Sequence, residues 1–355
     1  MISDLNPLSV VNYSIIIATR NHPNLLNRCL AALSRVQPPS EGWEVLVMDN
    51  SEKRLRVDNA QVVDSLHEPR FRYVSMTSWG SMAARHQGVE LASGRIISFI
   101  DDDSFVSETW LQGIEQSFRY PNVSLVCGPN RPEYETTPPD WLDYFWGENE
   151  HGRYLGYLSL SDFGNEPKEI LPTFVWSCNY SIRKEIFMQV KGSHPDYLPD
   201  QWKSFQGDGE GGLSVKVAAL GFQAHYSPLC SIRHWVPASR MTFDYFGNRA
   251  FFNGLHNSFT NFRREYGLGP LQGVPYSPSF RRARAWAGRI KRRLIQSIPS
   301  KSREPDDVVK LRQHLEKCYQ DGWNYHRSEI KRDARLREFV LRPDFMGNNA
   351  CIPER

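Results

Sequence analysis

The sequence feature that most constrains the fold is a short apolar run that ends in three consecutive carboxylates. The run, Ile96–Ile100, is β-branched and aromatic and predicts a buried strand, and Asp101–Asp103 follow it directly. Three negative charges repel one another unless water solvates them or a cation is shared among their oxygens. Carboxylate oxygens suit Mg²⁺ or Mn²⁺, which in turn bind the diphosphate of a nucleotide. The alternative is an exposed acidic turn that caps a helix beginning near Ser104 or Ser107.

The composition is that of an ordinary globular protein. With 355 residues, 40% of them hydrophobic and 23% charged, the chain can bury one large core or two moderate ones. A net charge of +3 is too weak to argue for nucleic-acid binding. There is no run of about 18 apolar residues and residues 1–7 do not resemble a signal peptide, so we expect neither a transmembrane helix nor secretion. The six cysteines lack C-x-x-C spacing, which favours reduced thiols in a cytoplasmic protein over disulfides or a zinc site.

Strands and helices alternate in the N-terminal part of the chain. The apolar patterns predict further strands at 13–18, 43–48 and 71–76 and helices at 24–35 and 81–92. This order indicates an α/β fold with a largely parallel sheet, and in such sheets ligands bind at the carboxyl ends of the strands. Thr19–Asn21, Asp49 and the carboxylate triplet all follow strands, so we expect them to converge.

The rest of the chain gives a weaker signal. Residues 129–169, rich in Pro, Tyr, Trp and acids, are predicted to be loop-like. Order is expected to return at 173–182. The patterns then predict helices at 183–190 and 213–220, short strands at 223–226 and 231–233, and helix from about 241 onward. A charged helical run is predicted at 306–341.

One further segment, residues 280–298, carries seven Lys and Arg residues, no acid, and apolar residues at helical spacing. This pattern is typical of an amphipathic helix that lies on an anionic membrane surface. A peripheral location at the inner face of the cell membrane would follow. The alternatives are a solvated basic face packed on the rest of the protein and a contact between subunits, which would make a homodimer.

Several segments, in their order and spacing, resemble the nucleotide-sugar glycosyltransferases of family 2, which have the GT-A fold. The resemblance spans about residues 12–255. Ala18 stands where the family usually has Pro, His86 where it has Asn, and Glu210 where it has a catalytic Asp. The segments that carry it are Ile15–Asn21, Val45–Asn50, Gly80–His86, Ala92–Asp103, Ser177–Lys184, Gly207–Leu213 and His234–Arg240.

The resemblance implies an α/β protein with a mixed, largely parallel GT-A sheet flanked by helices. Residues 1–265 would form the catalytic domain, with a nucleotide-binding half at about 12–128 and an acceptor-binding half at about 129–265. Residues 266–355 would form a helical, partly basic C-terminal extension. The implied reaction is an inverting, metal-dependent transfer from a nucleotide sugar to a glycan or lipid-linked acceptor in polysaccharide biosynthesis. UDP-sugar is the expected donor and GDP- or dTDP-sugars are the alternatives.

The resemblance also implies roles for individual residues. Asp103, Asp101 and His234 would hold Mn²⁺ or Mg²⁺, and Trp176 and Asn179 would bind the acceptor. The family places its catalytic base three residues before the Leu of the following helix, which gives Glu210, with Asp208 as the alternate. Helix capping is the other explanation for both acids. The residues expected to bind the nucleotide sugar are Ala18, Thr19, Arg20, Asn21, Asp49, Arg85, Asp101 and Asp102.

Two other kinds of protein remain as alternatives. A nucleotidyltransferase would carry a glycine-rich loop after the first strand, and Thr19–Pro23 does not supply one. A catalytically silent sugar- or nucleotide-binding protein would keep its function when both Asp208 and Glu210 are replaced.

Overall fold

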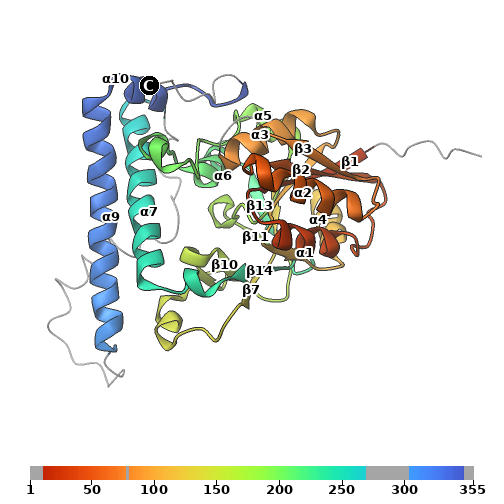
Figure 1. Ribbon diagram of the computed structural model, residues 1–355, viewed down its shortest axis with the longest axis horizontal. Helices are drawn as coiled ribbons and strands as arrows, with labels where there is room; N and C mark the ends of the chain where they lie inside the picture. The colour runs from red at the N-terminus through yellow and green to blue at the C-terminus, as the bar shows by residue number, and fades with distance from the viewer. Residues whose placement is uncertain (1–10, 77–79, 269–303, 348–355) are drawn as a thin grey trace, which may run out of the picture.

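The computed structural model describes residues 11–76, 80–268 and 304–347 (Figure 1). The sheets and the helices around them form the larger body, and the long helices α7 and α9 lie side by side at one end of it. The termini and the segment 280–298 predicted to bind a membrane lie outside the described residues. None of the described helices is long and apolar enough to cross a membrane.

The main sheet has eight strands in the order β11-β13-β6-β12-β4-β1-β2-β3. Strands β4, β1, β2 and β3 are parallel neighbours, whereas β12 and β11 run antiparallel to their partners. The predicted mixed, largely parallel α/β sheet is therefore confirmed. The strands are β1 (Val11–Thr19), β2 (Gly42–Asp49), β3 (Phe71–Ser75), β4 (Ile96–Asp101), β6 (Val123–Cys127), β11 (Lys168–Ile170), β12 (Asn179–Arg183) and β13 (Gln223–Tyr226).

A second sheet of six strands, in the order β5-β14-β7-β10-β9-β8, was not predicted. Most of it comes from residues 129–169, so the expectation of a loop there was wrong. The strands have two to five residues each, too few for an alternating pattern to show. They are β5 (Ser104–Val106), β7 (Asn130–Tyr134), β8 (Gly147–Glu148), β9 (Arg153–Leu155), β10 (Leu160–Asp162) and β14 (Ile232–Val236).

The position of β5 corrects the alternative explanation of the carboxylate triplet. The segment after Asp103 is this short buried strand, and the next helix begins only at Trp110. The triplet therefore does not cap a helix starting at Ser104 or Ser107. It lies where the chain leaves the main sheet and enters the second one.

Helices cover both faces of the main sheet. Ile15 and Ile17 of β1 pack in one core with α1 and α4, while Ile16 points to the other face and packs with α3, α5 and α6. The helices are α1 (Pro23–Leu33), α2 (Lys53–Ser65), α3 (Ser81–Leu91), α4 (Trp110–Phe118), α5 (Lys184–Gln189), α6 (Gly209–Ala219), α7 (Phe243–Glu265), α9 (Asp306–Arg332) and α10 (Ala334–Val340). Short 3₁₀ turns occupy Asp140–Phe145, Gly156–Leu158, Pro172–Phe174, Asp200–Phe205 and Ala238–Arg240. Helix α2 was not predicted, because it buries only Asn59 and Val63 and has no apolar stripe.

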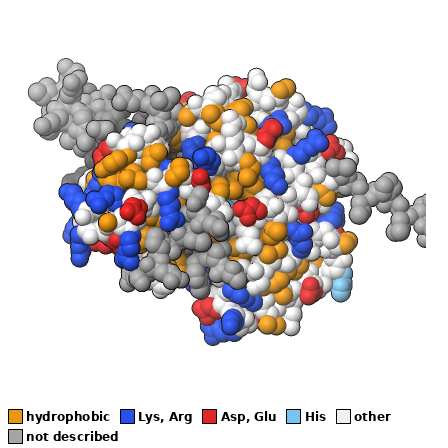
Figure 2. Space-filling view, turned by 90° about the horizontal axis from the view of Figure 1, so that it is seen from above, with side chains coloured by type: hydrophobic (Ala, Val, Ile, Leu, Met, Phe, Trp, Pro, Cys, Tyr) orange, Lys and Arg blue, Asp and Glu red, His pale blue; other side chains and the backbone are white. Residues whose placement is uncertain are grey.

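Helices α7 and α9 run parallel and are in contact along their length. Gly254 of α7 lies against Tyr319 of α9, and one turn further on Ser258 is 2.8 Å from Nδ1 of His326. On the face shown in Figure 2, acidic and basic side chains are mostly interspersed. Lys and Arg gather at the end formed by α9 and α10, where Lys331, Arg332, Arg335 and Arg337 are exposed.

Candidate active site

The sheet register brings the predicted donor-side residues together. In the parallel ladders, Thr19 is opposite Asp49 and Ala18 is opposite Asp101, so the ends of β1, β2 and β4 lie side by side. β14 brings His234 opposite Ser104, directly after the triplet. Convergence of these strand ends follows from the parallel α/β pattern.

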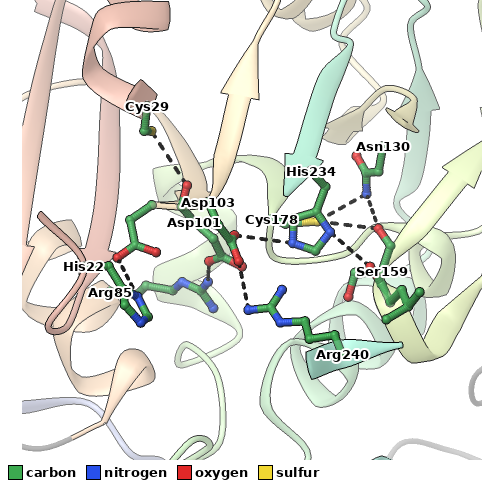
Figure 3. A network of polar contacts seen from close by, with 12 residues as sticks. His22, Cys29, Arg85, Asp101, Asp103, Asn130, Ser159, Cys178, His234 and Arg240 are labelled. Carbon is green, nitrogen blue, oxygen red and sulfur yellow. Dashed lines mark hydrogen bonds and ion pairs between the residues drawn. The ribbon is translucent and has the colours of Figure 1, made fainter. Parts of the chain in front are cut away.

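Asp101 is paired with a buried arginine. Nη2 of Arg85, on α3, lies 2.5 Å from Oδ1 of Asp101. The Arg85 side chain is 4% exposed, whereas that of Asp101 is 33% exposed. Arg85, Arg240 and His234 all point toward the carboxylates of Asp101 and Asp103 (Figure 3). The site therefore places cationic groups against its acids.

Asp102 is turned inward and holds the turn that follows β1. It accepts a hydrogen bond from Oγ1 of Thr19 at 2.6 Å, and Nδ1 of His22 lies 3.4 Å from the same oxygen. Burial, together with the neighbouring charge of Asp103, raises the pKa of Asp102. Asp102 thus connects β4 to the end of β1. His22 was not among the predicted site residues.

Asp103 has one oxygen paired and one oxygen without a hydrogen bond. Nη2 of Arg240 is 2.9 Å from Oδ2, and Nε2 of His234 is 3.3 Å from Oδ1. Within the described residues, Oδ1 has no hydrogen-bond partner although it is buried. Burial alone would raise the pKa of Asp103, but the charges of His234 and Arg240 outweigh it and hold the pKa below its usual range.

The second ring nitrogen of His234 indicates what this pair accommodates. Nδ1 lies 3.0 Å from the carbonyl oxygen of Leu158, so Nδ1–H donates there and Nε2 is the nitrogen that would offer a lone pair to a bound metal ion. That lone pair and Oδ1 of Asp103 face each other, an arrangement that a cation between them satisfies. A histidine ligand whose other nitrogen donates to a carbonyl is typical of metal sites.

The predicted three-residue metal set is only partly assembled. Among the described residues, no group of three or more His, Cys, Asp or Glu side chains is arranged to hold an ion. Asp103 and His234 form a pair that fits a divalent ion, while Oδ1 of Asp101 is engaged by Arg85. Any ion at this pair therefore needs oxygen ligands from elsewhere, such as a diphosphate.

Asp49 and Asn21 fix the two turns beside the triplet. Asp49 is fully buried, and its oxygens accept hydrogen bonds from the Ser51 amide, Asn59 and the Tyr73 hydroxyl. Asn21 is left-handed, with φ 62°, and its amide donates to Oγ of Ser51. Contacts of Asp49 and Asn21 with a nucleotide stay predictions, as do those of Ala18, Thr19 and the exposed Arg20.

The two candidate bases at the start of α6 have different surroundings. Asp208 is buried, with Oδ1 2.5 Å from Nδ1 of His194 and Oδ2 accepting a hydrogen bond from Thr260 of α7. Glu210 lies in the first turn of α6 and is only partly buried. Burial raises the pKa of Glu210 and the nearby Asp196 adds to the effect, against the opposing charge of Arg85. Glu210 is thus the more exposed of the two acids, whereas both oxygens of Asp208 are bonded; which of them is the catalytic base stays a prediction.

The glycines beside these acids serve close packing. A Cβ at Gly209, where φ is +52°, would lie 2.5 Å from Oδ2 of Asp196. A Cβ at Gly212 would lie 2.1 Å from Oδ1 of Asp208. Asp208 and Asp196 can approach the first turn of α6 only because these positions lack side chains. Residues Gly207–Gly212 therefore form a tightly packed helix start. Their glycine content alone would favour a mobile loop.

The two predicted acceptor-binding residues differ in the burial and hydrogen bonding of their side chains. Asn179 is buried and bonded to the Trp110 indole, to Asn130 and to the Cys230 carbonyl oxygen, so its amide joins β12 to α4, to β7 and to the loop before β14. Trp176 is partly buried and its ring contacts Tyr154 edge-on. Acceptor binding by both residues stays a prediction.

The sequence did not predict three residues that lie near Glu210, namely Asp196, Tyr197 and Arg249. Asp196 is buried beside Gly209, with Nε2 of His256 3.4 Å from its Oδ1. Arg249 of α7 donates from Nη1 to the Tyr197 hydroxyl at 3.0 Å. The sequence gives no periodic signal for the irregular segment 191–200, and Arg249 lies in a helix with many polar residues.

Comparison with known proteins gives the family. The profile of glycosyl transferase family 2 matches residues 14–191, about half of the chain. Glycosyltransferase AglE of Haloferax volcanii is 30% identical over 32% of this chain and 38% of its own length. The glucosyl-dolichyl phosphate glucuronosyltransferase of that organism is 23% identical over 49% of this chain and 54% of its own. The chain thus spans about two fifths to one half of the length of these curated relatives.

A solved structure supports the fold. The mannosyltransferase PcManGT from Pyrobaculum calidifontis, in complex with GDP-Man and Mn²⁺, superposes with a TM-score of 0.51 over 91% of this chain and 75% of its own, at 16% identity. At this identity the similarity concerns the fold alone, which is a GT-A arrangement with a helical C-terminal region. From the matched profile, the strand order and the strand-end carboxylates, the chain belongs to glycosyltransferase family 2.

Proposed function

We propose that this protein is a metal-dependent, inverting glycosyltransferase that moves a sugar from a nucleoside diphosphate sugar to a hydroxyl of a glycan or lipid-linked acceptor. The observation that carries the proposal is the buried Asp103–His234 pair, whose facing lone pairs fit a divalent cation. The pair lies at the ends of the parallel strands, where ligands of open α/β sheets bind.

The donor end of the proposed site consists of the triplet and its partners. A divalent ion bound there would offset negative charge on the departing diphosphate. Asp103 and His234 would hold it, with the diphosphate completing its shell. Arg240 and Arg85 add positive charge beside Asp103 and Asp101. Asp102 fixes the turn Thr19–His22, which we propose borders the ribose and base.

The acceptor end is built around Glu210. Its raised pKa and its place in the first turn of α6 suit a carboxylate that takes the proton of the attacking hydroxyl. Attack from the face opposite the diphosphate inverts the anomeric carbon. Asp208, held by His194 and Thr260, keeps the start of α6 in place.

For the donor we propose a UDP-sugar, with a GDP-sugar as the second candidate because the mannosyltransferase structure contains GDP-Man. Mn²⁺ and Mg²⁺ both suit carboxylate and diphosphate oxygens. We further propose that residues 1–265 form the catalytic domain and 266–355 an extension. Binding of residues 280–298 to an anionic membrane stays a proposal, tested by vesicle binding of a variant with Arg289, Lys291, Arg292 and Arg293 changed to Glu.

The test of the donor is a thermal-shift panel of UDP, GDP, dTDP and CDP, each with and without Mn²⁺. A ligand that binds only the native state raises the melting temperature, by an amount that grows with the logarithm of its concentration once this exceeds Kd. We expect stabilisation by UDP or GDP that depends on Mn²⁺. No shift with any nucleotide would contradict the proposed donor class.

A further inference from the structure

Tyr197 combines an unusual backbone conformation with an exposed ring. Its φ is 51°, a left-handed value that a bulky side chain seldom adopts, and its side chain is 54% exposed. Its amide donates to Oδ1 of Asp196 at 2.8 Å, which helps hold the conformation. Such strain is kept only where the surroundings impose it, and it concentrates at functional sites.

Arg249 forms a hydrogen bond with the hydroxyl group at the tip of this ring. Nη1 of Arg249 donates to the Tyr197 hydroxyl at 3.0 Å. Nε of Arg249 is buried and, in the part of the chain that the structure describes, has no hydrogen-bond partner. Tyr197 is thus fixed at its backbone by Asp196 and at its hydroxyl by Arg249, while about half of the residue stays exposed.

The neighbours of Tyr197 are those of the proposed base. Asp196 lies against Gly209, the residue before Glu210. Tyr197 and Arg249 are both near enough to Glu210 to interact with it electrostatically, and Arg240, the partner of Asp103, is near Tyr197. The ring of Tyr197 is therefore near both the proposed base and a cation of the donor end.

We propose that Tyr197 is the wall of an acceptor subsite on which a hexopyranose ring stacks beside Glu210, and that Arg249 is the residue that positions it. The inference rests on the proposed function. A general base must reach the attacking hydroxyl, so the sugar that carries this hydroxyl occupies the space next to Glu210. The face of an aromatic ring is electron-rich and attracts the C–H groups of a sugar ring.

The test uses methyl glycosides of glucose, mannose and galactose as probes, in the presence of UDP or GDP and Mn²⁺. Saturation-transfer NMR detects their contact with the protein without any turnover. We expect signals with wild type, slightly weaker signals with Tyr197→Phe, which keeps the ring but loses the bond to Arg249, and signals weakened about threefold to tenfold with Tyr197→Ala, the range expected for loss of one aromatic contact. Arg249→Lys, which keeps the charge but loses the planar fork, should weaken them less.

Two variants control for folding and for nonspecific stacking. Tyr197→Gly suits the left-handed backbone and removes the ring, so it should fold normally and lose the signal. Tyr120, just after α4, is 59% exposed. Tyr120→Ala removes this aromatic side chain and should leave the glycoside signal unchanged.

The outcomes separate this inference from the proposed function. If nucleotide and Mn²⁺ bind but no glycoside contacts wild type, or if Tyr197→Ala and Tyr197→Gly retain full signals, the acceptor subsite is wrong while the donor site stands. If the nucleotides themselves fail to bind, the proposed function fails. Loss of signal in both Tyr197 variants, with Tyr120→Ala unchanged, supports the subsite.

Discussion

Asp208 and His194 form a buried hydrogen bond in which Nδ1 of His194 lies 2.5 Å from Oδ1 of Asp208. This contact joins the segment after α5 to the first residue of the α6 turn, and Thr260 joins both to α7. Because Glu210 follows two residues later, the contact sets the position of the proposed base. Two acids in one glycine-rich stretch thus have separate tasks.

Replacing Asp208 by Asn should impair activity through position and stability. An amide lacks the negative charge that strengthens the hydrogen bonds from His194 and Thr260, and it must turn its NH₂ toward one of these two groups, so both contacts are weakened. We expect a loss of about 1–3 kcal/mol in the free energy of unfolding. Activity should fall, but the pH at which it is half-maximal should stay that of wild type, because Glu210 still titrates. A shift of that pH would instead identify Asp208 as the base.

Replacing Glu210 by Gln should reduce activity without destabilising the protein. Activity should drop about 10²–10⁴-fold, the usual contribution of a general base. The raised pKa of Glu210 means that the native state binds the proton more tightly than the unfolded chain does. The free energy of unfolding therefore falls as the pH rises from the ordinary glutamate pKa through the raised pKa of Glu210. Replacement by Gln removes this fall.

Thermal unfolding of Glu210→Gln and wild type at pH 5 and pH 7.5 tests this point. The variant should gain more relative stability at pH 7.5 than at pH 5. Equal differences at the two pH values would show that Glu210 is not desolvated in the native state.

Asp103→Asn and His234→Gln should weaken binding of Mn²⁺. Asn removes the negative charge of Asp103 and Gln removes the imidazole nitrogen of His234, so the stabilisation by nucleotide with Mn²⁺ should shrink toward that by nucleotide alone. Asp162→Asn, at a surface pair with Arg131, is the matched control. Calorimetric titration of Mn²⁺ in the presence of the nucleotide measures the effect. Unchanged affinity in both variants would exclude this pair as the metal site.

Acid should destabilise the protein below pH 6.5 through buried histidines. Burial lowers the pKa of His86 and of His194 to about 4. The unfolded chain, with an ordinary histidine pKa near 6.5, binds protons first, so stability is full above pH 6.5 and is lost as the pH falls toward 4. The loss reaches on the order of 3 kcal/mol per histidine.

His86→Gln should lower stability at pH 7 but flatten its decline between pH 6.5 and 4. Nδ1–H of His86 donates to the carbonyl oxygen of Phe345 and Nε2 accepts from the Ser193 amide, so Gln loses part of this bonding. The exposed His67, changed to Asn, is the control and should leave the pH profile unchanged. A decline as steep in His86→Gln as in wild type would contradict the assignment.

How much the sequence predicts depends on the length and regularity of each element. The strands β1, β2 and β4 are apolar runs buried on both faces, and their predicted positions agree with the structure to within two residues. The strands β8, β9 and β10 have at most three residues and depend on long-range pairing for their existence. No local pattern distinguishes such strands from loop.

The same reasoning applies to the site. It was predictable that Asp101–Asp103 and Thr19 lie close together, because parallel strands end at one edge of the sheet. That Asp102 turns inward while Asp103 faces His234 depends on how the chain enters β5, which the sequence does not reveal. Tyr197 and Arg249 are separated by about fifty residues and meet only through the packing of α7, so their pairing had no signal.

The most direct test of the central claim is release of nucleoside diphosphate from UDP-glucose and GDP-mannose with Mn²⁺, measured for wild type and Glu210→Gln. Water serves as the acceptor when no sugar is supplied, so the assay needs no knowledge of the natural acceptor. We predict Mn²⁺-dependent release by wild type from at least one donor, abolished by EDTA and reduced at least a hundredfold in Glu210→Gln. Release that is equally fast without metal, or unaffected by loss of the Glu210 carboxylate, would contradict the account.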